Sequence, residues 1–290
     1  MSVFIFIPTF NDGSFIRMSI ESIKNQTFSD FVCVINDDVS LDNTREEVRS
    51  AISGDDRFVL ICQETNGGAL KNESTLIRLG KQQYRRKYMF YFSGHDIVTP
   101  TYLEDAVSFL DSYSDYAMAS SSMRSFIDTP DVSIAMPEAE YTFFLTRGLR
   151  AFLNSAIQLV DCTIMNSVFR SDWFYDKDLF PIEIQMKGND LLMISWIVSY
   201  GFVSISRNST YFRRLFPADR DHRPPAHIRL VGIANTGNAL SEDELYRSMI
   251  TNYLRVFRAR FSDRMEDAEL AQFEQFLFES LYRRFPYNVI

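Results

Sequence analysis

Short hydrophobic runs, each bounded by polar or turn-forming residues, recur along the first hundred positions of the chain. Four of them predict buried strands, over residues 3–7, 31–35, 58–62 and 88–92. Each is followed by a segment that predicts a helix, over 14–26, 41–52, 69–80 and 100–113. Strand and helix therefore alternate four times, which predicts an α/β fold with a largely parallel sheet.

The pattern is less regular in the second part of the chain. Strands are predicted over 116–120, 161–169 and 202–206, a helix over 191–200, and a helical segment over 241–285. Residues 121–150 show no clear period and predict a loop suited to substrate binding. The run from Arg213 to Pro225 is basic, contains proline and predicts another loop.

The composition excludes several classes of protein. The chain has 290 residues, 46% hydrophobic and 23% charged, as in an ordinary globular protein. Its net charge of −8 argues against a general nucleic-acid-binding protein. We see neither a membrane-spanning stretch nor a signal peptide. Three widely spaced cysteines form no metal-ligand pattern and suit a reducing compartment. We therefore expect a cytoplasmic protein.

The sequence Ser93-Gly-His-Asp96 follows the fourth predicted strand and is the strongest candidate for a functional site. Ser93 and Gly94 allow the chain to turn, which places His95 and Asp96 at the C-terminal end of a central strand. Ligands bind at that edge of open α/β sheets. The alternative is that Asp96 only caps a turn, but its position favours a functional role.

Two further acidic sites are expected beside Asp96 in a doubly wound sheet. Asp37-Asp38 follow the second strand, and Asp190 stands at a helix start. Converging carboxylates repel each other, so a divalent cation held together with substrate phosphates is the usual solution. This favours a nucleotide diphosphate, and neither G-x-G-x-x-G nor G-x-x-x-x-G-K-[ST] is present. Structural roles are the alternative, although Ser40 is itself a predicted cap for the helix after Asp38.

Six short motifs occur in a specific order along the chain. They are VFIFIPTFN (3–11), SIKNQT (22–27), NDDVSLDNT (36–44), NGG (66–68), SGHD (93–96) and GND (188–190). Together they resemble the family 2 glycosyltransferases, over about residues 2–215. The resemblance implies the GT-A fold, a Rossmann-like, mainly parallel central sheet flanked by helices. It divides residues 1–215 into a nucleotide-sugar-binding half (1–115) and an acceptor-binding half (116–215), and leaves 216–290 as a basic loop and a C-terminal helical extension.

The resemblance also implies which residues bind the donor, commonly a UDP-sugar. In the family, the loop after the first strand and the acidic pair after the second hold the base and ribose. The expected donor-binding residues are Pro8, Thr9, Phe10, Asn11, Asp38, Asn66, Lys71, Gly94, His95, Arg213 and Arg214. Lys71 fits a solvated helix face equally well, and the two arginines fit a surface loop nearly as well.

The metal motif of the family, Asp-x-Asp, is only partly present. Gly94 takes the first acidic position, His95 the middle one and Asp96 the last. The resemblance implies that Asp96 binds Mn²⁺ or Mg²⁺, which neutralises the leaving diphosphate. His95 and His222 are further candidate ligands, and imidazole suits Mn²⁺ better than Mg²⁺. Because position 94 has no carboxylate, we expect a weaker contact with the ribose or the metal.

Asp190 matches the position of the catalytic base of the family. An inverting transfer is a single displacement, and it needs a carboxylate to deprotonate the acceptor hydroxyl on the face opposite the diphosphate. Asn189 replaces the first member of the usual acidic pair. The alternative for Asp190 alone is an N-cap, and the other motifs in order favour the catalytic role.

We therefore expect a metal-dependent, inverting glycosyltransferase (EC 2.4, hexosyltransferase type) that moves a sugar from a UDP-sugar to a saccharide or glycolipid hydroxyl. The resemblance suggests bacterial polysaccharide synthesis, such as capsule or O-antigen. A non-catalytic nucleotide-sugar-binding subunit is the alternative, because of Gly94 and Asn189. A sugar-nucleotide pyrophosphorylase is disfavoured, because its Gly-rich loop is missing. For residues 241–285 we expect packing against the GT-A core or a homodimer contact, and a contact with the inner face of the membrane is the alternative.

Overall fold

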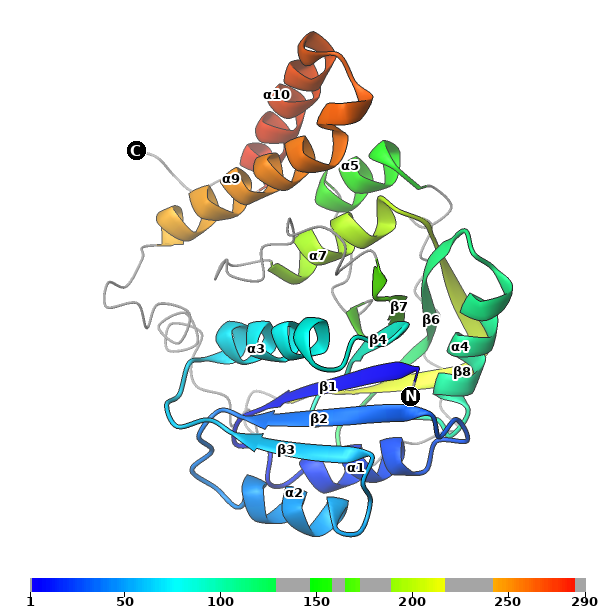
Figure 1. The fold of residues 1–290 in the computed structure, drawn as a ribbon. Helices are drawn as coiled ribbons and strands as arrows, with labels where there is room; N and C mark the ends of the chain where they lie inside the picture. Colours follow the sequence, from blue (N-terminus) through cyan, green and yellow to red (C-terminus); the bar gives the residue numbers. More distant parts are fainter. Residues whose placement is uncertain (1, 129–146, 158–164, 173–188, 217–241, 285–290) are drawn as a thin grey trace.

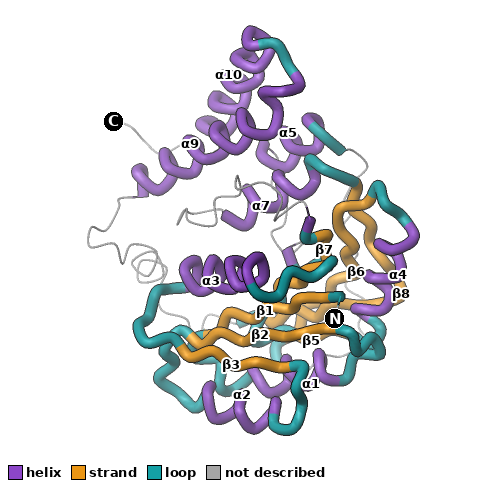
Figure 2. Tube along the Cα trace, viewed as in Figure 1, coloured by secondary structure: helices purple, strands orange, loops and turns teal. Residues whose placement is uncertain are grey.

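The computed structural model describes residues 2–128, 147–157, 165–172, 189–216 and 242–284. The described strands form one sheet in the order β3-β2-β1-β4-β7-β6-β8-β5. Helices cover both faces of this sheet, and two further helices extend from one of these layers (Figure 1). Figure 2 shows the strands as the middle layer between the two sets of helices. The predicted α/β fold is confirmed.

The first half of the chain is the regular part of the sheet. Its strands are β1 (Val3–Thr9), β2 (Phe31–Asp37), β3 (Phe58–Cys62) and β4 (Tyr88–Tyr91). The pairs β1–β2, β2–β3 and β1–β4 are parallel. The connecting helices are α1 (Ile16–Lys24), α2 (Thr44–Ile52) and α3 (Ala69–Gln82). All seven elements lie where the hydrophobic pattern predicts them, with small differences at their ends.

Strand β1 is hydrophobic on both of its faces because helices cover the sheet on both sides. Its residues Phe4 and Phe6 face the cluster that includes α3, whereas Ile5 and Ile7 face the cluster that includes α1 and α2. All four side chains are fully buried. A strand with two buried faces reads as a continuous hydrophobic run, which is the pattern seen in the sequence.

The second half of the chain makes the sheet mixed. Its elements are β5 (Ile97–Val98), α4 (Tyr102–Ser112), β6 (Tyr116–Phe126), α5 (Leu149–Ile157), β7 (Val168–Arg170), α7 (Asn189–Val198) and β8 (Phe202–Arg214). Strand β7 pairs antiparallel with β4 and β6, β8 runs parallel to β6, and β5 pairs antiparallel with β8. Among the described strands, only β7 and β5 run opposite to the others, so the sheet is mixed but mainly parallel, as the resemblance implies.

Several local features differ from the predictions. Residues 121–126 and 207–214 continue β6 and β8, so Arg213 and Arg214 belong to a strand and not to a loop; they pair with Ser125 and Phe126. The short helix α5 was not predicted. Helix α2 begins at Thr44 and not at residue 41, and Ser40 does not cap it. The hydroxyl of Ser40 instead accepts a hydrogen bond from the backbone N–H of Asn11.

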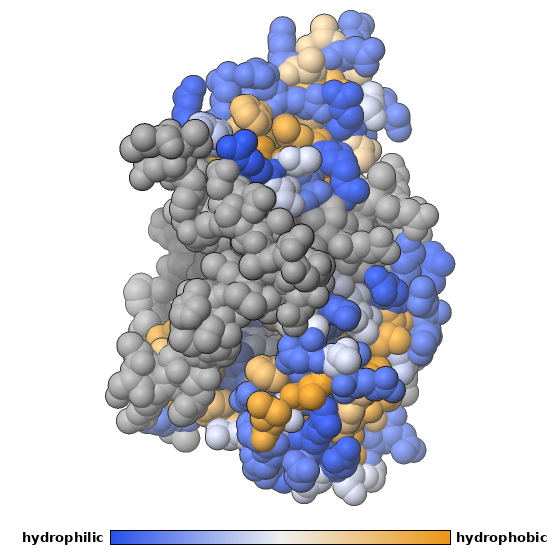
Figure 3. Space-filling view, turned by 90° about the vertical axis from the view of Figure 1, so that its left-hand side faces the viewer, coloured by the Kyte–Doolittle hydropathy of each residue, from blue (hydrophilic) through white to orange (hydrophobic). Residues whose placement is uncertain are grey.

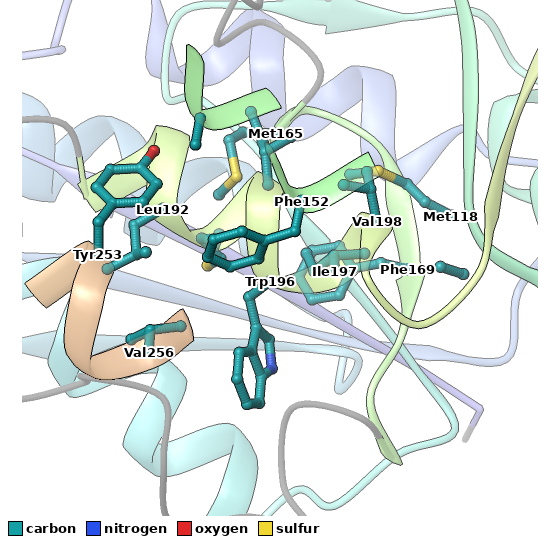
Figure 4. Close-up of a cluster of buried hydrophobic side chains, with 14 of the residues drawn as sticks. Met118, Phe152, Met165, Phe169, Leu192, Trp196, Ile197, Val198, Tyr253 and Val256 are labelled. Carbon is teal, nitrogen blue, oxygen red and sulfur yellow. The ribbon is translucent and has the colours of Figure 1, made fainter. Parts of the chain in front are cut away.

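The C-terminal helices α9 (Glu242–Phe261) and α10 (Asp267–Arg284), joined by the short 3₁₀ helix η3 (Ser262–Arg264), pack over α5 and α7. Their hydrophobic residues join the core cluster that also covers the α3 face of the sheet. Trp196 of α7 is 1% exposed and lies in this cluster (Figure 4). On the face shown in Figure 3, the surface of α9 and α10 is mostly hydrophilic, with some hydrophobic residues among the hydrophilic ones. No described helix has the length and hydropathy needed to cross a membrane.

A buried arginine fastens α9 to the end of α7. The guanidinium of Arg260 donates hydrogen bonds to Oγ of Ser199 (2.9 Å) and to its carbonyl oxygen (3.0 Å). It also lies 3.9 Å from the centre of the Tyr200 ring. The last carbonyls of a helix lack partners within the helix, so this contact satisfies α7 while it positions α9.

The substitution Trp196→Ala tests whether the C-terminal helices share one core with the sheet. We expect it to lower the free energy of unfolding by about 3–5 kcal/mol, the usual cost of removing a large buried ring. Chemical denaturation followed by circular dichroism measures the change. Phe276→Ala is the matched control, because that ring is 51% exposed on α10. Equal effects of the two substitutions would contradict a shared core.

Candidate active site at the carboxyl ends of the parallel strands

Four loops leave the carboxyl ends of the parallel strands at the same edge of the sheet. They are loop 1 (residues 10–15), loop 2 (38–43), loop 3 (63–68) and loop 4 (92–96), which follow β1, β2, β3 and β4. The register pairs Thr9 with Asp37, so loops 1 and 2 start side by side. Almost all donor-binding residues predicted from the sequence lie in or beside these loops.

Loops 1 and 2 are joined by hydrogen bonds between side chains and backbone. The N–H of Asn11 donates to Oγ of Ser40 (2.9 Å), and the N–H of Leu41 donates to Oδ1 of Asn11 (2.8 Å). The N–H of Gly13 donates to a carboxylate oxygen of Asp42 (3.0 Å). The two loops therefore form one rigid wall of the site.

The same wall contains strained backbone. Asn11 has φ of 56° and Val39 has φ of 63°, both in the left-handed region. This region is unusual for any residue with a side chain and especially unfavourable for a β-branched one. Gly13 has a different constraint, since a Cβ there would lie 2.2 Å from Oδ1 of Asn43. Strained residues held by their surroundings gather at functional sites, which supports this edge as the site.

Asp38 organises loop 3. Its two carboxylate oxygens accept hydrogen bonds from the N–H groups of Gly67 and Gly68, both at 2.8 Å. The side chain of Asn66 donates to the Asp38 carbonyl (2.7 Å). Burial raises the pKa of Asp38, and the two glycine N–H groups oppose that rise. Lys71 is exposed, and its aliphatic part lies against Gly67.

Asp37 points elsewhere than Asp38, although the two are adjacent in the sequence. Its side chain is fully buried and forms an ion pair with Arg45, at 2.5 Å, and it also accepts from the N–H of Ser40 (3.2 Å). Asp37 therefore holds α2 and loop 2 through Oδ2, while its Oδ1 is buried without a hydrogen-bond partner among the described residues. The alternation of side chains along a strand explains the difference between the two residues.

Asp96 is 2% exposed and joins loop 4 to strand β8. Its Oδ2 accepts from the hydroxyl of Tyr211, and its Oδ1 accepts from the backbone N–H of Arg214, both at 2.7 Å. Burial, reinforced by the Asp96 carboxylate, raises the pKa of Tyr211 well above its usual value. The tyrosine therefore stays a hydrogen-bond donor to Asp96.

Arg214 is a buried clamp rather than a surface residue. Its guanidinium donates to the carbonyl oxygens of His95 and Ile127. It also lies between two rings, 4.4 Å from the centre of Phe15 and 4.5 Å from that of Phe126. Burial lowers its pKa, and nearby Asp96 opposes that shift. Donor binding by Arg214, as the resemblance implies, would require this clamp to open, whereas its hydrogen bond to His95 places it beside loop 4.

Sequence reasoning missed one acidic residue of the site, Asp12 in loop 1. Its Oδ2 accepts from the hydroxyl of Thr9 (2.7 Å), and its Oδ1 lies 3.3 Å from Nδ1 of His95. The other ring nitrogen of His95 lies 2.9 Å from Oγ of Ser93. An acidic residue directly after a motif was the only signal in the sequence, and nothing in it indicated a partner more than eighty positions away.

The structure thus brings most predicted site residues to one edge of the sheet. Thr9 directly precedes loop 1, and Phe10, which is 37% exposed, and Asn11 lie within it. Gly94, His95 and Asp96 stand in loop 4, next to loop 1. Asp190 belongs to the first turn of α7. Its side chain and the whole of His222 lie outside the described residues.

A divalent cation fits these residues only if the donor supplies most of its ligands. The described part of the chain contains no group of three His, Cys, Asp or Glu side chains placed to hold a metal. Asp96 uses two of the roughly four acceptor positions of a carboxylate. It can therefore give one oxygen to a hard cation whose other ligands are diphosphate oxygens and water.

Comparison with solved structures identifies the fold. The chain superimposes on TarS of S. aureus, residues 1–349, in complex with UDP-GlcNAc, with a TM-score of 0.67 and 17% identity. The match covers 98% of this chain and 73% of that one. GalNAc-T7 with UDP, GalNAc and Mn²⁺ gives a TM-score of 0.62 and 12% identity over 96% of this chain and 55% of that one. Structures of this fold thus include one that contains Mn²⁺.

Comparison with sequences identifies the family. The putative glycosyltransferase EpsH of Bacillus subtilis is 28% identical over 104 residues, which are 36% of this chain and 28% of EpsH. The chain thus matches less than a third of the length of that relative. A family model described as glycosyl transferase family 2 matches residues 4–176, which is more than half of the chain. The chain therefore belongs to family 2 of the glycosyltransferases, enzymes of class EC 2.4, and has the GT-A fold.

Proposed function

We propose that this enzyme transfers a sugar, with inversion, from a UDP-sugar to a hydroxyl group of a saccharide or lipid-linked saccharide. The observation that carries the proposal is the rigid wall made by loops 1 and 2, with loop 3 fixed to it through Asp38. A preformed site loses little conformational freedom when it binds a nucleotide. The complexes of TarS with UDP-GlcNAc and of GalNAc-T7 with UDP support uracil as the base.

The donor lies along the edge of the sheet in this proposal. Phe10 offers a partly exposed ring beside the base, with Pro8, Thr9 and Asn11 around it. Asp38 binds the uracil or ribose through the acceptor positions that the two glycine N–H groups leave open. Asn66 and Lys71 close this end, and Gly94, His95 and Arg213 border the diphosphate.

The diphosphate carries negative charge that must be balanced as it leaves. Asp96 and His95 would hold a divalent cation, Mn²⁺ or Mg²⁺, with His222 as a further ligand; when bound, the cation neutralises the leaving group. Asp96 is suited to this because its two internal hydrogen bonds fix its orientation. Arg214 keeps loop 4 in place through the His95 carbonyl.

The chemical step requires a base on the acceptor side. Asp190 in the first turn of α7 takes the proton of the acceptor hydroxyl as the new bond to the anomeric carbon forms and the bond to the diphosphate breaks. Residues 116–215 contribute the acceptor-binding half. The resemblance supports an acceptor in bacterial polysaccharide synthesis, such as capsule or O-antigen, and an enzyme in the cytoplasm.

The C-terminal helices offer a surface for association. Phe276, Phe278 and Tyr282 of α10 are between 42% and 51% exposed. Contact of this helix with the inner face of a membrane, or with a second copy of the chain, would cover these rings.

The alternative function is a non-catalytic subunit that binds the nucleotide sugar, and it is motivated by Gly94 and Asn189. Turnover distinguishes the two, because such a subunit would bind the donor without releasing UDP from it.

Calorimetric titration of UDP, GDP and CMP, with and without Mn²⁺, tests the donor class. We expect UDP to bind more tightly than GDP or CMP, and Mn²⁺ to increase the affinity for UDP. Asp96→Asn keeps the shape of the side chain and is expected to weaken Mn²⁺-dependent binding about tenfold or more, equivalent to roughly 1.4 kcal/mol. Asp56→Asn, in an exposed turn, is the control. Absence of binding by every nucleotide under every condition would overturn the proposal.

The variant Asp190→Asn tests the chemical step. Removing a general base is expected to lower kcat by about 10²–10⁴-fold, measured as release of UDP from the donor in the presence of acceptor. The affinity for UDP, measured in parallel, is expected to stay at the wild-type value. Wild-type protein that binds a UDP-sugar and never releases UDP would favour the non-catalytic subunit. A variant with full kcat would exclude Asp190 as the base.

A further inference from the structure

The space next to Gly94 is filled by a carboxylate from another loop. A Cβ added at Gly94 would lie 2.8 Å from Oδ2 of Asp12, 3.1 Å from Cδ1 of Ile16 and 3.3 Å from Oγ1 of Thr9. The first distance is shorter than real contacts allow, so the side chain of Asp12 occupies the position that a side chain at residue 94 would take. Gly94 is the residue that replaces the first acid of the metal motif.

Backbone conformation does not explain the glycine. Gly54, Gly68 and Gly148 adopt positive φ and would be strained with a side chain, but Gly94 is not among the positive-φ glycines. An L-residue therefore fits the backbone at position 94. The obstacle is the Asp12 carboxylate, and the glycine leaves room for it.

Asp12 is held firmly but keeps access to the site. The Thr9 hydroxyl fixes one carboxylate oxygen at 2.7 Å, and the His95 ring stands 3.3 Å from the other. The Asp12 side chain is 15% exposed, in contrast to Asp37, which is 0% exposed and paired with an arginine. The backbone N–H of Phe10 also donates to Oδ2, at 3.4 Å, so these three contacts leave about one of the roughly four acceptor positions of the carboxylate for a ligand.

We propose that Asp12 is the donor-binding carboxylate that this enzyme uses in place of an acidic residue at position 94. The proposal rests on the proposed function, since the ligand is the UDP part of the donor. The carboxylate contacts an electropositive group there, either a ribose hydroxyl or the cation on the diphosphate. The carboxylate thus belongs to loop 1, but it lies where a side chain of loop 4, at position 94, would otherwise lie.

The test moves the carboxylate from one loop to the other. The variants are Asp12→Ala, Gly94→Asp and the double variant Asp12→Ala/Gly94→Asp, with Asp56→Asn as an exposed control. UDP affinity is measured by calorimetry with and without Mn²⁺. We expect Asp12→Ala to weaken binding roughly 10- to 100-fold, as for hydrogen bonds to charged groups. Gly94→Asp alone also weakens binding, because two carboxylates compete for one space.

The double variant is expected to bind UDP within about threefold of wild type. Its loss of affinity is therefore much smaller than the added losses of the two single variants. A loss in Asp12→Ala both with and without Mn²⁺ assigns the contact to the ribose, and a loss confined to Mn²⁺ assigns it to the cation. Wild-type affinity in Asp12→Ala would overturn the proposal. A double variant as weak as Asp12→Ala would also overturn it, since the carboxylate would then not be exchangeable.

Thermal unfolding separates binding from folding in the same set of variants. Gly94→Asp is expected to lower the melting temperature, and adding Asp12→Ala is expected to restore it, whether or not a nucleotide is present. Asp12→Asn keeps the shape of the side chain and is expected to lose UDP affinity with little change in melting temperature. Failure of wild-type protein to bind UDP would overturn the proposed function itself, whereas wild-type binding that Asp12 variants retain overturns only the role of Asp12.

Discussion

A buried carboxylate, Asp96, joins the two halves of the sheet. A charge removed from water must be compensated by hydrogen bonds, and here the donors come from Tyr211 and Arg214 at the end of β8. The same arginine then reaches the His95 carbonyl and lies against Phe15 of loop 1. Loop 1, loop 4 and β8 are therefore fixed relative to one another, and the edge of the sheet depends on this one group for its shape.

The site around this group is mostly preorganised polar structure. The left-handed conformations of Asn11 and Val39 are unfavourable in isolation, and the hydrogen bonds between loops 1 and 2 hold them in place. Asp38 extends the arrangement to loop 3 through two backbone N–H groups. On the other side of the sheet, Arg260 secures α9 to the end of α7, the helix whose first turn holds Asp190. The edge of the sheet and helix α7 thus rest on separate supports.

The sequence predicts the first half of the fold well because its signals are local. Each of β1 to β4 is a hydrophobic run, and each following helix has its own spacing. Prediction is poorer where the partner is distant: β6 and β8 continue only because they pair with each other, so Arg213 and Arg214 look like a loop. Ser40 looks like a cap because its true partner, Asn11, lies in another loop. The motifs indicate the edge of the sheet, but the contact of Asp12 with Gly94 depends on a register that no motif contains.

The shared space of Asp12 and Gly94 has a consequence for the history of this protein. Neither position can change freely, because an acid at 94 needs a shorter residue at 12, and loss of the acid at 12 removes the only carboxylate that the described residues place at this point between loops 1 and 4. Moving the acid from position 12 to position 94 takes two substitutions. A protein with only one of them is expected to bind UDP more weakly than a protein with both or with neither. Such a pair is a case of epistasis, and the two positions should change together among relatives.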